Sequence, residues 1–260
     1  MKKFSSFLVV LMLMLASFTA GMEYPRGDVD QDGAVNISDV TCLIDYLLSG
    51  SWPDEPVTPP DEHEWVDLGL PSGTLWATCN VGANAPEDYG HYFAWGETDH
   101  KYVYSWSNYK WCNGSNGGLT KYCSRSADGY NGFVDNKTEL DLEDDAAYVN
   151  WGPSWRMPTT EQQQELFDKC SLVWATQDGV NGLLVTGPNG NTMFLPAAGI
   201  HWYESLDLVG THGNYWSRTL YSSGCFSSFF LVFHCGNSDE WGCHLNGREY
   251  GHSVRAVRVP

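Results

Sequence analysis

Basic residues are scarce in this sequence. Its 260 residues include 14 lysines and arginines against 32 aspartates and glutamates, which gives a formal net charge of -18. Such a chain repels phosphate backbones and anionic lipid, so the charge disfavours nucleic-acid and membrane-surface partners. Soluble ligands and calcium ions fit the charge better.

Long hydrophobic runs are also rare. One run, Phe7 to Leu15, follows Lys2 and Lys3 close to the N-terminus. It is too short to cross a bilayer as a helix and is typical of a secretory signal peptide, which we assign to residues 1–21. No second run of this kind follows. We therefore expect a secreted product in the periplasm, at the cell surface or outside the cell, with no membrane insertion.

Motifs of common enzymes are missing too. The sequence has no G-x-S-x-G element, no P-loop and no dinucleotide-binding fingerprint. A glycoside hydrolase would need two paired carboxylates. The acidic run Glu143, Asp144 and Asp145 is better explained by helix capping or by a structural calcium ion. We therefore expect a protein that is not an enzyme.

A calcium-binding loop is present after the signal peptide. Carboxylates and a glycine occupy positions 1, 3, 5, 6 and 12 of an EF-hand-type loop, and the backbone carbonyl at position 7 adds a neutral oxygen. The last position holds Asp instead of the usual Glu, and the entering helix is missing. The expected ligands of Ca²⁺ are Asp28, Asp30, Asp32, Ala34 and Asp39. Apolar residues with helical spacing follow at Val40, Leu43, Ile44, Leu47 and Leu48.

This loop and helix, within residues 27–50, resemble one repeat of a type I dockerin. Dockerins are calcium-dependent modules that bind cohesin domains, so the resemblance implies a cohesin-like partner and puts Ile37 and Ser38 at the contact. Dockerins normally carry two such repeats, whereas this sequence has one. A single repeat could dock on the main domain, pair with another chain, or bind calcium without binding cohesin.

A spacer and one larger domain follow the repeat. Residues 51–64 hold four prolines and five acidic residues, a composition that favours an extended linker. The main domain, residues 65–260, alternates short β-prone runs with Gly, Pro and Asn turns. Residues 100–140 show no sustained helical period, and we expect loops there.

Two local patterns predict regular elements in the main domain. Thr159 followed by Gln162 is a capping box, which predicts a helix of about three turns. The apolar face of this helix would carry Leu166, Phe167 and Cys170. The turn sequence Pro-Asn-Gly-Asn predicts a hairpin of two strands, Gly182 to Thr186 and Thr192 to Pro196. Helix and strands together indicate an α+β domain.

Several segments of the main domain resemble a known family. VDLGLPSGTLWATCNVGA, DYGHYFAWGET, SWRMPTTEQQQEL and REYGHSVRAVR follow one another in this order. They look like the FISUMP, or "Fib-succ major paralogous", domain of secreted bacterial proteins. The resemblance implies a C-type-lectin-like fold related to formylglycine-generating enzymes, with small antiparallel sheets, one main helix and long loops.

The tail, residues 213–259, combines a regular frame with an irregular set of side chains. Residues that short strands would turn inward are Tyr215, Trp216, Leu231, Phe233, Trp241, Tyr250, Val254 and Val257. Between Gly224 and Glu249 the tail departs from FISUMP-like sequences, which tend to hold Asn, Ser and Tyr. The wider fold group includes the variable proteins of diversity-generating retroelements, so the resemblance implies a variable binding face.

Strand alternation selects the side chains of that face. If Leu231 and Phe233 point to the core, then Phe230, Val232 and His234 point outward together. Exposed Phe and Val beside His favour a contact patch. The predicted ligand-binding residues are Phe226, Phe230, Val232, His234, Asp239, Glu240, Cys243, His244, Leu245 and Glu249.

The cysteines leave several alternatives open. None of the eight forms a C-x-x-C pair, which argues against zinc-ribbon and thioredoxin-type sites. Cys112 and Cys123 could close one loop by a disulfide, or each could be a small buried apolar residue. His234, Cys235, Cys243 and His244 form a superficial Cys₂His₂ set, but neighbouring strand residues point to opposite faces, which disfavours a zinc site. A disulfide between Cys235 and Cys243 is favoured over a zinc site, and two free thiols are the remaining alternative.

These observations favour a secreted, non-catalytic binding protein that is tethered through a calcium-binding repeat. Its ligand would be a protein or a glycan on a cell or phage surface. An alternative is a dockerin-borne component of a polysaccharide-binding or polysaccharide-degrading system, and a further one is a surface-adhesion module without a defined ligand.

Overall fold

The computed structural model describes Val40, Leu43 and Ile44, and residues 63–236 and 238–258. The chain divides into two units, residues 1–62 and 63–260. In the first unit the three described residues are helical, in agreement with the apolar spacing of that segment. Several predicted features lie outside the described residues: the signal peptide, most of the linker, the calcium ligands Asp28, Asp30, Asp32, Ala34 and Asp39, and the contact residues Ile37 and Ser38. Every helix in the described part is too short or too polar to span a lipid bilayer.

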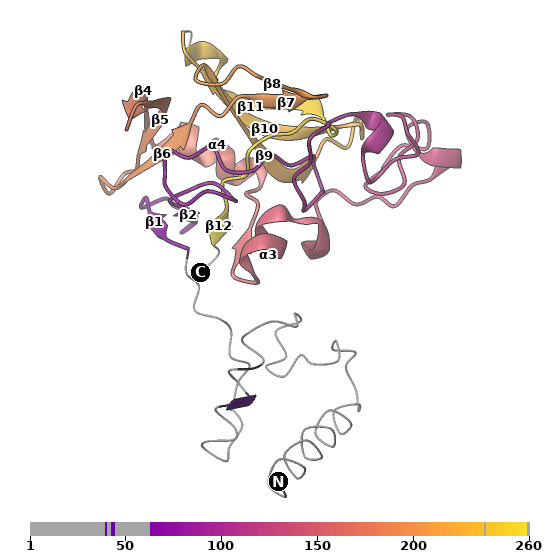
Figure 1. Cartoon of the computed structure of the whole chain (residues 1–260), viewed down its shortest axis with the longest axis horizontal. Helices are drawn as coiled ribbons and strands as arrows, with labels where there is room; N and C mark the ends of the chain where they lie inside the picture. Colours follow the sequence, from indigo (N-terminus) through magenta and orange to yellow (C-terminus); the bar gives the residue numbers. More distant parts are fainter. Residues whose placement is uncertain (1–39, 41–42, 45–62, 237, 259–260) are drawn as a thin grey trace, which may run out of the picture. The chain divides into compact units, whose positions relative to one another are not determined.

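A four-stranded antiparallel sheet joins the two ends of the second unit (Figure 1). Its strands follow in the order β1 (Trp65–Asp67), β2 (Leu75–Ala77), β12 (Val257–Arg258) and β3 (Trp155–Arg156). Val257 pairs with Trp76 on one side and with Arg156 on the other. The C-terminal strand is therefore inserted between segments from the first half of the domain.

A three-stranded antiparallel meander contains the predicted hairpin. It consists of β4 (Ser171–Gln177), β5 (Val180–Thr186) and β6 (Thr192–Pro196). The hairpin prediction is confirmed, with β5 starting two residues earlier than expected, and Gly190 in the turn has a φ of +87°. Strand β4, in which exposed and half-buried residues alternate over most of its length, is not among the predicted elements.

The main helix, α4 (Thr160–Lys169), begins where the capping box predicts. The backbone N–H of Thr159 donates to Gln162 Oε1 at 2.9 Å, and the N–H of Gln162 donates to Thr159 Oγ1 at 3.2 Å. The helix lies against the sheet of β9 (His212–Leu220), β10 (Ser227–His234) and β11 (Gly242–Gly247). Gln163 Nε2 extends the contact by donating to the carbonyl of Tyr215 at 3.0 Å.

Strand β10 is the centre of that sheet, in the order β11-β10-β9, and both of its faces are buried. Leu231 and Phe233 pack into one hydrophobic cluster with Tyr215. Phe230 packs into a second cluster with Trp216. A strand between two cores forms the fixed frame of the domain, and the predicted inward positions Tyr215, Trp216, Leu231, Phe233, Val254 and Val257 are confirmed as buried.

The loop prediction for residues 100–140 is also confirmed. This stretch contains two short 3-10 turns, η1 (Trp106–Asn108) and η2 (Tyr130–Gly132), and isolated bridges. The buried guanidinium of Arg248 holds it in place by donating to the carbonyls of Tyr122 at 3.1 Å and Lys121 at 3.2 Å. A short turn, η3 (Leu142–Asp144), and α3 (Ala146–Trp151) then lead into β3.

Two smaller elements complete the domain. The strands β7 (Ile200–Trp202) and β8 (Ser205–Asp207) form a two-stranded hairpin, and η4 (Ser238–Glu240) connects β10 to β11. The described part of the main domain therefore belongs to the α+β class, with small antiparallel sheets and few helices.

Candidate ligand-binding site

The hairpin of β10 and β11 places the predicted ligand-binding residues on two sides of the sheet. Phe230 pairs with His244, and Leu231 pairs with Cys243. Because paired residues point to the same side, His244 shares the side of Phe230, whereas Cys243 shares the side of Leu231 and α4. The Cys243 thiol lies 3.8 Å from the carbonyl oxygen of Thr160, and burial raises its pKa to about 11. The predicted set is thus not one continuous face.

Phe230 is buried, so the prediction that it is exposed is wrong. Its exposed fraction is 7%. The ring stacks on the imidazole of His252, with ring centres 4.8 Å apart and planes 13° apart. Val232, two residues along, is half-buried and packs against the same cluster. The physical reason is that the segment carrying His252 crosses this side of the sheet and covers it.

Glu249 is buried as well, and its prediction as a rim residue is wrong. Its exposed fraction is 7%, and its Oε2 atom has no hydrogen-bond partner among the described residues. Burial raises the pKa of this carboxyl to about 7, against the opposing effect of hydrogen bonds from its own backbone N–H and from Trp106. Glu249 is therefore part of the buried interior of the domain and not of its ligand-accessible surface.

The remaining predicted residues surround β11, which is the edge strand of its sheet in the described structure. His234 Nε2 lies 3.2 Å from Glu240 Oε2, and the His234 ring stacks on that of His212 with centres 5.1 Å apart. Burial and the neighbouring His234 lower the pKa of His212. We use the name "β11 edge" for the set Phe226, His234, Asp239, Glu240, His244 and Leu245, all of which are exposed except the half-buried His234.

The cysteine alternatives are decided for the described residues. All seven described cysteines, Cys79, Cys112, Cys123, Cys170, Cys225, Cys235 and Cys243, are free thiols. Neither the bridge between Cys112 and Cys123 nor that between Cys235 and Cys243 is formed. The thiol of Cys123 donates to the carbonyl of Arg125 at 3.0 Å and has the thiol of Cys225 as a neighbour, and burial raises the pKa of Cys123 to about 11.

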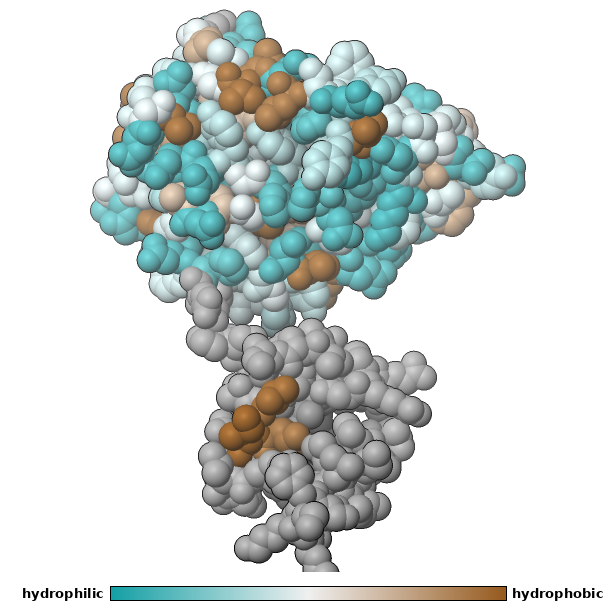
Figure 2. Space-filling view, viewed as in Figure 1, coloured by the Kyte–Doolittle hydropathy of each residue, from teal (hydrophilic) through white to brown (hydrophobic). Residues whose placement is uncertain are grey.

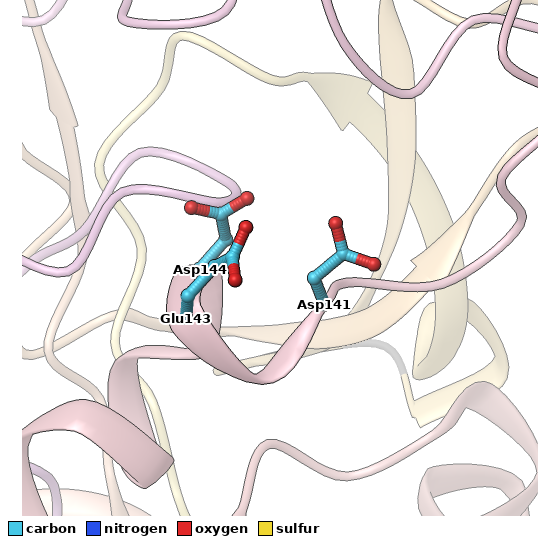
Figure 3. A group of neighbouring side chains, drawn as sticks. All are labelled: Asp141, Glu143 and Asp144. Carbon is cyan, nitrogen blue, oxygen red and sulfur yellow. The ribbon is translucent and has the colours of Figure 1, made fainter. Parts of the chain in front are cut away.

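One acidic cluster in the described part of the chain could hold a metal ion: Asp141, Glu143 and Asp144, which have ligand atoms within 4.8 Å of one another (Figure 3). The ammonium group of Lys121 already occupies the space between them, at 2.7 Å from Asp141, 3.1 Å from Glu143 and 2.6 Å from Asp144. Burial alone would lower the pKa of Lys121, but these carboxylates raise it above its ordinary value. Lys110 and Lys137 form further ion pairs with Asp144 and Asp141, so lysines of the chain itself balance the charge of the cluster.

Asp145, next to this cluster, caps α3, as predicted for the acidic run. Its Oδ1 accepts the backbone N–H groups of Ala147 at 3.0 Å and Tyr148 at 3.1 Å. The same atom accepts the N–H of Met157 at 3.0 Å. The carboxylate thus joins the start of α3 to the segment after β3.

An exposed patch on the β7–β8 hairpin was not predicted from the sequence. We use the name "hairpin patch" for its exposed hydrophobic residues Trp202, Tyr203, Leu206, Leu208 and Val209. Figure 2 shows hydrophobic side chains gathered at the top of the domain, where Figure 1 draws β7, β8 and β11. A shallow hollow of about 450 Å³ lies there, lined by Trp202, Tyr203, Glu204, Ser205 and Asp207. Its signal in the sequence is the aromatic pair Trp-Tyr with two acidic residues within the next four positions, in the segment WYESLD.

A stack of aromatic rings connects the hairpin patch to β10. The ring centres of Trp202 and Tyr250 are 6.0 Å apart with planes at 27°, and those of Tyr250 and His252 are 6.5 Å apart at 9°. His252 in turn stacks on Phe230. The hairpin patch is therefore supported by the same rigid frame that carries the β11 edge.

Both surfaces offer groups that suit recognition: ring faces, carboxylate acceptors and imidazoles over a packed core. Comparison with known proteins assigns no family to this arrangement. No protein-family model matches the chain, and no match is found among the curated proteins or the solved structures.

Proposed function

We propose that the chain is a secreted, non-catalytic binding protein that contacts a protein or glycan ligand through the β11 edge. One observation carries the proposal: exposed aromatic, aliphatic, acidic and imidazole side chains line the two sides and the ends of an edge strand whose neighbour, β10, is buried on both faces. Changes at the β11 edge leave the two cores intact. A fixed frame beneath a changeable surface is the arrangement that a variable binding protein needs.

The resemblance to FISUMP domains supports the same proposal. An α+β domain with small antiparallel sheets and long loops is compatible with a C-type-lectin-like fold. A variable surface of the retroelement type would concentrate its changes at Phe226, His244 and Leu245, which are exposed, and spare Phe230 and Glu249, which are buried.

The N-terminal repeat would tether the domain. Asp28, Asp30, Asp32, the carbonyl of Ala34 and Asp39 would bind Ca²⁺ in the proposed repeat. Calcium would order the loop and its helix, and Ile37 and Ser38 would then contact a cohesin-like partner.

A binding screen tests the proposed site. The full chain is applied to paired glycan and protein arrays beside the triple variant His234→Ala, Glu240→Ala, His244→Ala. We expect the variant to lose at least tenfold in affinity, about 1.4 kcal/mol, with an unchanged melting temperature. Val173→Ala, an exposed change on β4, is the matched control and should bind as the unchanged chain does. A ligand that the triple variant retains in full would disprove the assignment to the β11 edge.

A further inference from the structure

The β7–β8 hairpin exposes several large hydrophobic side chains that are not buried by the rest of the domain. The exposed fraction is 46% for Trp202 and 56% for Tyr203, and both residues line the hollow. Leu206 pairs with His201 and so points to the other side of the hairpin from Trp202, which pairs with Ser205. Large exposed apolar side chains that line a hollow mark a contact site. The hollow of about 450 Å³ on the hairpin gives such a contact a defined position.

The backbone of the hairpin is held from outside. Tyr203 exchanges two backbone hydrogen bonds with Tyr104, at 3.0 and 2.9 Å, and His201 exchanges two with Gly251, at 2.8 and 2.9 Å. Tyr203 has a φ of +49°, a left-handed conformation that a tyrosine adopts at a cost and keeps only where the surroundings enforce it. The hollow is thus formed before any ligand arrives.

The aromatic rings of the hollow are preorganised in the same way. Trp202 stacks on Tyr250, which fixes one face of its indole. The ring centres of Trp202 and Tyr203 lie 5.3 Å apart with planes at 57°, the geometry of an aromatic pair in direct contact. The two rings therefore support each other, and a ligand group in the hollow would meet the exposed surface of this pair.

Negative charge lines the other side of the hollow. Asp207 accepts a hydrogen bond from the Ser205 hydroxyl at 3.0 Å, and Glu204 lies in the turn. Neither carboxylate forms an ion pair with a basic residue of the described part of the chain. Burial lowers the pKa of nearby His201, so this imidazole adds no positive charge at neutral pH.

The combination of ring faces and unpaired carboxylates selects a positive ligand. A cation gains both from the aromatic quadrupole within about 6 Å of a ring and from the carboxylates. A neutral sugar would gain from the rings but not from the charge, and the net charge of -18 further favours a cation. We infer that the hollow binds the ammonium or guanidinium group of a lysine or arginine side chain that belongs to a partner polypeptide.

A titration with a model peptide tests this inference. The full chain is titrated with the capped tripeptide Ala-Lys-Ala while the indole N–H signals are followed by NMR, with the Trp202 signal assigned by its loss in Trp202→Ala. We expect saturable binding that is at least tenfold weaker for the peptide with an Nε-acetylated lysine. Raising the ionic strength from 0.1 to 1 M should also weaken binding, because salt screens the carboxylates.

Two variants separate a built site from a general acidic surface. Trp202→Ala and the pair Glu204→Gln, Asp207→Asn should each lower affinity about tenfold. Trp65→Ala removes a tryptophan with the same exposed fraction, 46%, and should leave binding unchanged. A retained pattern of folded signals in the same spectra would distinguish lost binding from lost structure.

Several outcomes would overturn the inference. These are equal binding of the acetylated peptide, unchanged binding in the double carboxylate variant, or an equal shift of the Trp202 signal by a neutral oligosaccharide such as cellotetraose at the same concentration. The triple variant of the β11 edge should bind the lysine peptide normally. Failure of the hairpin inference is therefore distinguishable from failure of the proposed function.

Discussion

At the scale of single residues, the sequence predicts which side chains are buried only in part. Strand alternation correctly predicts that Leu231 and Phe233 point inward, but it cannot show that Phe230 on the opposite side is also covered. That information depends on where the segment with Glu249 and His252 crosses the sheet, which is a tertiary contact. The same segment carries two groups whose pKa values burial displaces: Glu249 to about 7 and His252 to about 3.

The carboxyl of Glu249 should make the stability of the domain fall as the pH rises. In the unfolded chain it loses its proton near pH 4.5, whereas in the folded domain it holds the proton until about pH 7. Its stabilising effect is therefore complete below pH 4.5 and is lost as the pH rises through 7. Glu249→Gln should raise the free energy of unfolding at pH 8 by about 2 kcal/mol, after allowance for partial solvent screening, and change it little at pH 4.

Urea unfolding at pH 4 and pH 8 checks this prediction. A variant with the same advantage at both pH values would show that packing, not ionisation, is responsible. Asp178→Asn, a change of the same kind in the exposed turn between β4 and β5, is a suitable control.

At the scale of elements, prediction succeeded where local chemistry decides the structure. The capping box of Thr159 and Gln162 fixes the start of α4, and the turn Pro-Asn-Gly-Asn fixes the hairpin of β5 and β6. It failed for the β7–β8 hairpin, because Tyr203 occupies a left-handed position where a glycine or asparagine would have signalled the turn. The contacts with Tyr104 that enforce this conformation come from a segment about 100 residues earlier in the sequence.

The two groups of acidic residues should differ in calcium binding. In the cluster of Asp141, Glu143 and Asp144, the ammonium of Lys121 already supplies the positive charge. The N-terminal loop has no such lysine among its ligands. We expect that Asp30→Ala with Asp32→Ala abolishes calcium binding of the full chain, and that Asp141→Asn leaves it unchanged.

Isothermal titration with CaCl₂ measures both variants against the unchanged chain. Retained binding in the Asp30 and Asp32 variant would contradict the assignment to the N-terminal loop. Loss of binding in Asp141→Asn would show that calcium displaces Lys121 from the cluster.

At the scale of the whole domain, the loop-rich residues 100–140 are attached to the sheet by contacts that are distant in sequence. Arg248 donates to the carbonyls of Tyr122 and Cys225 at 3.1 and 2.9 Å, and so connects the loops to the β9–β10 connection. Ser124 reinforces this contact, since its backbone N–H lies 3.1 Å from the sulfur of Cys225. The sequence predicted loops here but not their attachment, because no local pattern records a contact over such a separation.

An oxidant should form a disulfide bond at the same junction. Cys123 and Cys225 are fully buried neighbours, whereas Cys112 hydrogen-bonds to the carbonyl of Trp106. During refolding with oxidised glutathione, thiol–disulfide exchange would form a disulfide between the two sulfurs. One molecule of oxidised glutathione is reduced for each bridge, and the two molecules of reduced glutathione that are released carry the two thiol protons. Peptide mapping should find the Cys123–Cys225 bridge, with a stabilisation of about 3 kcal/mol. Cys112→Ala should form it normally and Cys225→Ser should not, while a bridge between Cys112 and Cys123 would contradict the packing of this junction.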